Sequence, residues 1–119
     1  MDPILEQAQK LAEMLAADPR FTTLRQLEGD VLNDPEKRRL LEDYEKSRLA
    51  LELKQRELQP ISPDEKKAHA EVTKRVHGVP ALLDLARAQA DYAHMMDQVN
   101  RTIHDLLRAD LDAEGPPTG

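Results

Sequence analysis

The chain has 119 residues, of which 34% are charged, and its formal net charge is −6. This length fits one domain, and the acidic balance, with a pI near 5.2, lacks the basic excess typical of nucleic-acid binders. The sequence contains no cysteine, which excludes disulfides, thiolate catalysis and zinc or iron–sulfur sites held by cysteine.

Proline marks the start of each predicted helix. Pro is tolerated at the first helical position, and an Asp or Ser directly before it can cap the free backbone amides. Four dipeptides fit this pattern: Asp2-Pro3, Asp18-Pro19, Asp34-Pro35 and Ser62-Pro63. Glu65 stands at the position that completes a capping box with Ser62. A fifth start, at Pro80, follows Gly78, the residue type that most often ends a helix.

These signals divide the chain into five predicted helices, over about residues 3–17, 19–32, 35–59, 63–77 and 80–111. Both signs of charge are interspersed along them, which is typical of long exposed helices. We therefore predict one helical domain over residues 1–111. Residues 112–119 are acidic and then rich in Pro and Gly, and they are predicted to form a disordered tail.

The strongest pattern lies in the last predicted helix. Side chains recur there at alternating steps of three and four residues, the heptad spacing that places them on one seam of a helix. The seam consists of Leu82, Leu85, Gln89, Tyr92, Met96, Val99, Ile103 and Leu106. A second stripe widens the face and consists of Ala86, Ala93, Asn100 and Leu107. A face of this length needs another helix against it, so we predict that the seam from Leu85 to Leu106 is an interface.

The economical arrangement of the helices is a long antiparallel hairpin. Residues 35–77 would run in one direction and residues 80–111 in the other, joined by the short turn at 77–79. The two shorter N-terminal helices would pack across part of it. Such a hairpin leaves apolar surface uncovered, so we expect a second copy to cover it in a dimerising bundle or a higher homo-oligomer. The predicted fold class is all-α.

Two amide side chains and two adjacent methionines lie on or near the apolar seam. Gln89 and Asn100 lie on or beside it, where a buried amide can fix the register and the partner. The alternative is that both lie at its edge and contact water. Met96 is interpreted as core filler, whereas Met95 lies off the main stripe and is a candidate for a second interface.

Catalytic and metal sites find little support in the residues. Asp91 and His94 are spaced i, i+3, but the Glu-x-x-His motif of di-iron helical bundles does not occur. Four arginines could hold an anionic substrate, as in an all-helical mutase: Arg48, Arg75, Arg87 and Arg101. Each has an acidic residue three or four positions away, which is typical of a solvated helix face. We therefore expect no enzymatic activity, no catalytic residue, no metal and no cofactor.

Two local basic clusters leave one alternative function open. They are Lys37-Arg38-Arg39 and Lys66-Lys67, and they could serve an RNA-binding accessory factor, although their simpler interpretation is solvated helix surface. Direct nucleic-acid binding is disfavoured by the net charge. The sequence shows neither a signal-peptide pattern nor an apolar run of transmembrane length, so we expect a cytoplasmic protein that does not insert into membranes.

Several motifs, in order, resemble the YlbF/YmcA family of small bacterial helical proteins. Residues 4–12 resemble its opening helix, and Arg20-Phe21 lies where the family has an aromatic residue in its second helix. Residues 33–44 begin with Asn-Asp-Pro-Glu, similar to the signature that opens the long helix. Val79-Pro80 resembles the start of the last helix, and Val99-Asn100 resembles its end. The resemblance spans about residues 3–108.

The resemblance implies a fold and a role. It implies an all-α helical hairpin, dimerisation or higher assembly, and adaptor work without catalysis. The best-understood members join a complex that acts with a membrane-associated endoribonuclease in mRNA processing, and so influence competence, sporulation and biofilm formation. We therefore expect a regulator that works through helix-mediated protein contacts, with an RNA-processing complex among its partners. The cysteine-held clusters of some members cannot be carried over, because this chain has no cysteine.

Overall fold

The computed structural model describes residues 2–114 and builds them from five helices. They are α1 (Pro3–Ala17), α2 (Pro19–Leu32), α3 (Pro35–Arg56), α4 (Pro63–His77) and α5 (Pro80–Glu114). No strand occurs within the described residues, and the predicted all-α class is confirmed.

The helix starts lie where the capping pattern predicts them. The carboxylates of Asp2, Asp18 and Asp34 accept hydrogen bonds from first-turn amides at 2.9, 2.9 and 3.1 Å. At α4, the Ser62 hydroxyl accepts from the Glu65 amide at 3.1 Å, and the Glu65 carboxylate accepts from the Ser62 amide at 3.4 Å. This reciprocal pair is the predicted capping box.

Two helix ends differ from the prediction. Helix α3 stops at Arg56 instead of residue 59, because Leu58 adopts a left-handed backbone with φ 55°. The Gln59 amide then donates to the Lys54 carbonyl at 2.9 Å, which closes the helix end. Helix α5 continues past residue 111 to Glu114, so the first part of the predicted tail is helical. The rest of that tail, residues 115–119, lies outside the described residues.

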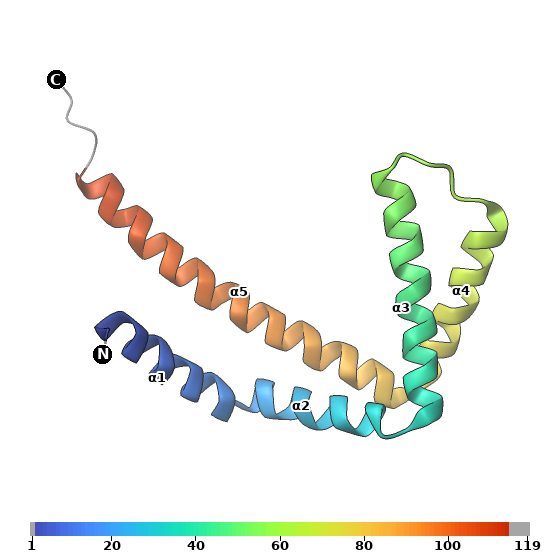
Figure 1. The fold of residues 1–119 in the computed structure, drawn as a ribbon, viewed down its shortest axis with the longest axis horizontal. Coiled ribbons are helices and arrows are strands. Elements are labelled where there is room, and N and C mark those ends of the chain that lie inside the picture. The colour runs from blue at the N-terminus through green and yellow to red at the C-terminus, as the bar shows by residue number, and fades with distance from the viewer. Residues whose placement is uncertain (1, 115–119) are drawn as a thin grey trace.

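The helices form two limbs that meet at a corner (Figure 1). Helices α3 and α4 form an antiparallel hairpin of their own, which is one limb. Helix α5 runs beside α2, and α1 extends the line of α2 toward the far end of this second limb. The predicted pairing of residues 35–77 with residues 80–111 is therefore wrong. The segment around Pro60 reverses the chain instead of kinking it, so α4 covers the inner face of α3 and leaves α5 to α2.

The core is small and lies where α2, α3, α4 and α5 meet. Its buried side chains are Leu24, Val31, Leu40, Val76, Leu82, Leu85 and Ala88. Away from the corner, one aromatic contact in each limb adds to the packing of its helices. Phe21 meets Tyr92 in the long limb, and His69 stacks on Tyr44 in the hairpin, each pair with ring centroids 5.8 Å apart.

The fold is extended for its length. Its radius of gyration is 20.7 Å, whereas a compact chain of this size has about 13–14 Å. Its accessible surface is 9666 Å², whereas a compact monomer of this mass exposes roughly 6,500 Å². A large part of the helix surface that a globular domain would cover is therefore open.

Candidate protein-interaction site

One face of α5 is covered by the chain itself. This face, the core stripe, consists of Leu82, Leu85, Ala88, Tyr92, Met95 and Val99. Helix α2 packs against it, and Met95 is only 4% exposed. Each step along the stripe is three or four residues, as expected for one face of a helix.

The predicted seam divides between this face and its neighbour. Leu85, Tyr92 and Val99 lie on the core stripe and are buried or half-buried. Gln89 is exposed, Met96 is half-buried and Ile103 is 47% exposed, because they point away from α2. Leu106 continues the line of the core stripe beyond its last contact and is 65% exposed. Whether these residues meet another molecule stays a prediction.

The methionine assignment is the reverse of the predicted one. Met95, placed off the stripe by the sequence pattern, lies in the interior, and Met96 lies at the edge. Sequence reasoning also missed Ala88. Ala88 lies three residues after Leu85 and four before Tyr92, which is the spacing of one helix face. Alanine, however, is only a weak indicator of a buried position.

A second face of α5, the lateral stripe, has no cover from this chain. It consists of Ala86, Gln89, Ala93, Met96, Asn100, Ile103 and Leu107. At 100° per residue it lies roughly a quarter turn from the core stripe. All its members are exposed except the half-buried Met96. In the single chain, Gln89 and Asn100 therefore contact water.

A third uncovered surface lies at the free end of the long limb. Helix α1 continues the line of α2, and it diverges from the last turns of α5 (Figure 1). The exposed apolar side chains here, which we call the open arm, are Ile4, Leu5, Leu106 and Leu111. Ile4 is 78% exposed, and it stands beside the exposed Leu5 in the first turn of α1.

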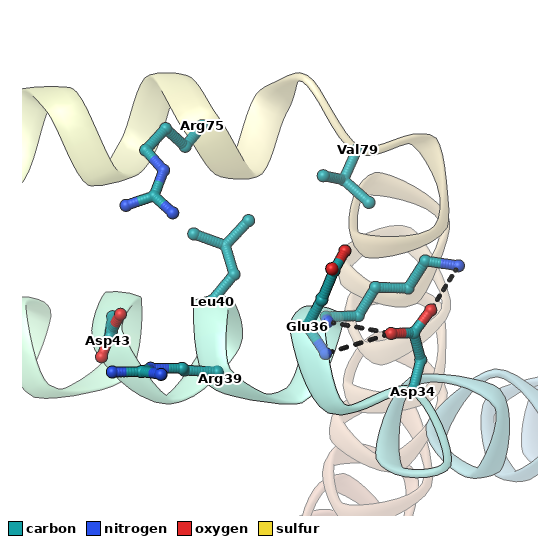
Figure 2. A pocket seen from close by; sticks show the side chains of 8 residues that line it. Asp34, Glu36, Arg39, Leu40, Asp43, Arg75 and Val79 are labelled. Carbon is teal, nitrogen blue, oxygen red and sulfur yellow. Dashed lines mark hydrogen bonds and ion pairs between the residues drawn. The ribbon is translucent and has the colours of Figure 1, made fainter.

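A hollow of about 550 Å³ lies at the corner of the two limbs, and Figure 2 shows its lining. Three acidic and three basic side chains surround it: Asp34, Glu36, Asp43, Lys37, Arg39 and Arg75. Asp34 is occupied by its capping bonds and by Lys37 at 3.4 Å. The amide of Lys37, above all, holds the Asp34 pKa below its ordinary value. The charges therefore balance, and the hollow has no excess of one sign.

The four arginines considered for substrate binding do not converge. Arg48 pairs with Glu45 at 2.9 Å and with Glu52 at 3.1 Å, and Arg101 pairs with Asp97 at 3.2 Å. The hydrogen bond to Glu45 is the main cause that raises the pKa of Arg48. The other two arginines line separate hollows.

The histidines likewise form no site. The His69 imidazole is hydrogen-bonded to the Ser47 hydroxyl at 2.7 Å, which joins α4 to α3. Among residues 2–114, His, Asp and Glu side chains nowhere gather in the number that a metal ion requires.

The two basic clusters lie apart. Lys37–Arg39 begins α3, and Lys66–Lys67 begins the antiparallel α4, so roughly 20 Å of helix separates them. Lys37 is paired with Asp34, and Arg38 approaches Glu42 at 3.9 Å. The two clusters do not form the continuous basic surface that follows a phosphate backbone.

In the described part of the chain, no helix has the length and apolar composition for crossing a membrane.

Comparison with known proteins identifies the family. The model for the family described as "Control of competence regulator ComK, YlbF/YmcA" matches residues 4–108. The chain belongs to the YlbF/YmcA family. The resemblance in its sequence motifs is thereby confirmed, and the family is one of regulators.

Two solved structures share this YlbF/YmcA fold. One is a protein of unknown function (DUF964) from Bacillus stearothermophilus, with 20% identity and a TM-score of 0.75 over 90% of this chain and 94% of that one. The other is RicA from Bacillus subtilis, in complex with RicF, with 21% identity and a TM-score of 0.66 over 90% of this chain and 95% of that one. No individual curated protein sequence matches the chain.

Proposed function

We propose that this YlbF/YmcA family protein is a non-enzymatic regulatory adaptor in the cytoplasm. It binds other helical proteins through the faces of α1 and α5 that its own fold leaves uncovered. The observation that carries the proposal is the surface excess of about 3,000 Å² over a compact monomer. A standard protein interface buries about 800 Å² on each partner, so the excess is enough for more than one such contact.

The open arm is the proposed docking site for a different protein. Its aliphatic side chains stand on the first turn of α1 and the last turns of α5, which diverge from each other (Figure 1), so a partner helix placed between them could bury both. Bacillus subtilis RicA has been solved with a protein partner, RicF, and its fold is similar. By analogy, the partner of this chain is a second helical protein, for which members of the same family are the first candidates.

The process that the adaptor serves is proposed from the family. Its description is control of a competence regulator, and the resemblance in the sequence implies an RNA-processing complex that affects competence, sporulation or biofilm formation. In this proposal the chain contributes protein contacts to that complex, and its separated basic clusters do not bind the RNA.

Binding to purified family members from the same host, measured by calorimetry, tests this function. Leu106→Asp and Ile4→Asp should each weaken binding at least tenfold, since each places a charge in an apolar contact. His104→Asp adds a negative charge at the same level of α5, away from Leu106, and should bind as the wild type. Equal binding by all three variants would overturn the docking site.

An RNA assay at low salt distinguishes the remaining alternative. The adaptor proposal expects no RNA binding by the purified chain. Binding that weakens steeply with salt, and that is lost when Lys66 and Lys67 are changed to Glu, would replace it with the RNA-binding function.

A further inference from the structure

We propose that two copies of the chain pair through their α5 helices, antiparallel, along the lateral stripe. In this pairing Gln89 of each copy lies opposite Asn100 of the other. The pairing goes beyond the adaptor function because it assigns a self-association surface distinct from the open arm.

The lateral stripe has the spacing of a helix-pairing seam. From Ala86 to Leu107 its steps alternate between three and four residues without interruption. The chain's own contacts on α5 use the core stripe, so the lateral stripe is not needed for the fold of the monomer. Its exposed aliphatic side chains Ile103 and Leu107, 47% and 59% accessible, lie in water unless a partner covers them.

The stripe is complementary to itself when reversed. A twofold axis between His94 and Met95 places Ala86 opposite Ile103 of the second copy and Ala93 opposite its Met96. A small side chain thus faces a large one at these two levels, which fills space evenly. A parallel pairing would instead put Ala93 against Ala93 and Met96 against Met96, leaving a void at one level and crowding at the other.

The two amides fix the register of this pairing. In the reversed arrangement Gln89 and Asn100 meet, and each can donate and accept a hydrogen bond. A shift by one heptad would place Gln89 against Ala93 or Leu107, and Asn100 against Leu82 or Met96. Each amide would then be covered by an apolar side chain with no partner, which is costly.

A niche at the corner of the limbs supports the same register. It has a volume of about 110 Å³, and its lining includes Leu41, Tyr44, Leu82 and Ala86. In the proposed pairing, Ile103 of the second copy lies opposite the exposed Ala86. The niche therefore receives an aliphatic side chain that the single chain leaves 47% exposed.

Cysteine cross-linking tests the proposal directly, because the natural chain has no cysteine. Gln89→Cys and Asn100→Cys are made as separate proteins and oxidised alone and as a mixture. The antiparallel register predicts a disulfide dimer in the mixture and little in either protein alone. Self-cross-linking of either single variant, or no cross-linking in the mixture, would overturn it. Arg87→Cys, on the opposite face of α5, is the control that should not cross-link with Asn100→Cys.

A size exchange supplies a second test that leaves the monomer fold intact, because Ala93 is exposed. Ala93→Met should weaken the dimer about tenfold or more by crowding Met96 of the second copy. Adding Met96→Ala in the same chain should restore most of the affinity. Failure of this rescue would overturn the register. A chain that stays monomeric and still captures its partner through the open arm would overturn this pairing alone and leave the adaptor function standing.

Discussion

The rings of Phe21 and Tyr92 lie with their centroids 5.8 Å apart and their planes inclined by 52°. This contact joins the first turn of α2 to the middle of α5, beyond the buried cluster at the corner. Tilted aromatic pairs at this distance are favourable beyond the area that they bury. This aromatic pair therefore helps to align the long limb, together with Met95, which is buried one turn further along α5.

Replacing Phe21 with Ala should lower the free energy of unfolding by about 2 kcal/mol, somewhat less than for a fully buried ring, because Phe21 is half-buried. Urea denaturation measures the loss. The exposed neighbour Thr22→Ala is the matched control and should stay close to the wild type. Equal stability of the two variants would mean that the ring contact does not hold α2 on α5.

Two adjacent methionines should respond in opposite ways to the same substitution. Met95→Asp places a charge in the interior of the monomer and should cost several kcal/mol of folding stability. Met96→Asp should leave the helix content of the monomer nearly unchanged and should weaken association between copies. Circular dichroism measures the first effect and light scattering the second. The result against this account is a folded Met95→Asp protein or an unfolded Met96→Asp protein.

Asp18 should titrate far below an ordinary carboxyl. Its pKa is lowered from 3.8 to about 2, chiefly by the side-chain hydrogen bonds of Arg20 at 2.9 Å. Because the folded value is the lower one, the contribution of Asp18 to stability is present above about pH 4 and is lost as the pH falls toward 2. An NMR titration of the carboxyl carbon measures this pKa.

The variant Arg20→Gln tests the cause of that shift. It should raise the Asp18 pKa, yet leave it somewhat below 3.8, because the backbone amide of residue 20 still donates to the carboxylate. A pKa unaffected by the substitution would show that the guanidinium is not responsible.

Leu58 is a site where a small substitution should stabilise the protein. Its φ of 55° is unfavourable for a residue with a Cβ, and its side chain is 92% exposed. Leu58→Gly should therefore raise the free energy of unfolding by about 0.5–1 kcal/mol. Leu58→Ala keeps the Cβ and should gain nothing. Thermal unfolding that ranks Ala above Gly would contradict this explanation.

Helix starts could be predicted from sequence because each depends on two or three adjacent residues. Asp18 caps the chain immediately before Pro19, and Ser62 and Glu65 satisfy each other's amides, so no distant contact is needed. The end of α3 was missed because nothing local marks Leu58 as left-handed. A leucine there looks like one more member of an apolar helix face.

The packing of α5 could be predicted only in part. Leu85, Tyr92 and Val99 were correctly placed on an apolar face, but Gln89 and Met96 were assigned to the same face. Two stripes on one helix share the same three-and-four spacing, so periodicity alone does not separate them. The partner of α5 depends on the reversal near Pro60, which decides whether α4 or α5 covers α3. Which helix packs on α3 is decided by tertiary contacts, so the sequence pattern of α5 does not indicate it.

The claim about α5 that most needs testing is that its lateral stripe, left open by the fold, is covered by α5 of a second copy. Sedimentation equilibrium of the purified chain at micromolar concentration tests it most directly. We expect a particle of twice the 13.5 kDa chain mass, with Ile103→Asp shifting it toward the monomer. A stable monomer of 13.5 kDa that keeps its helix content over the whole concentration range would contradict the claim.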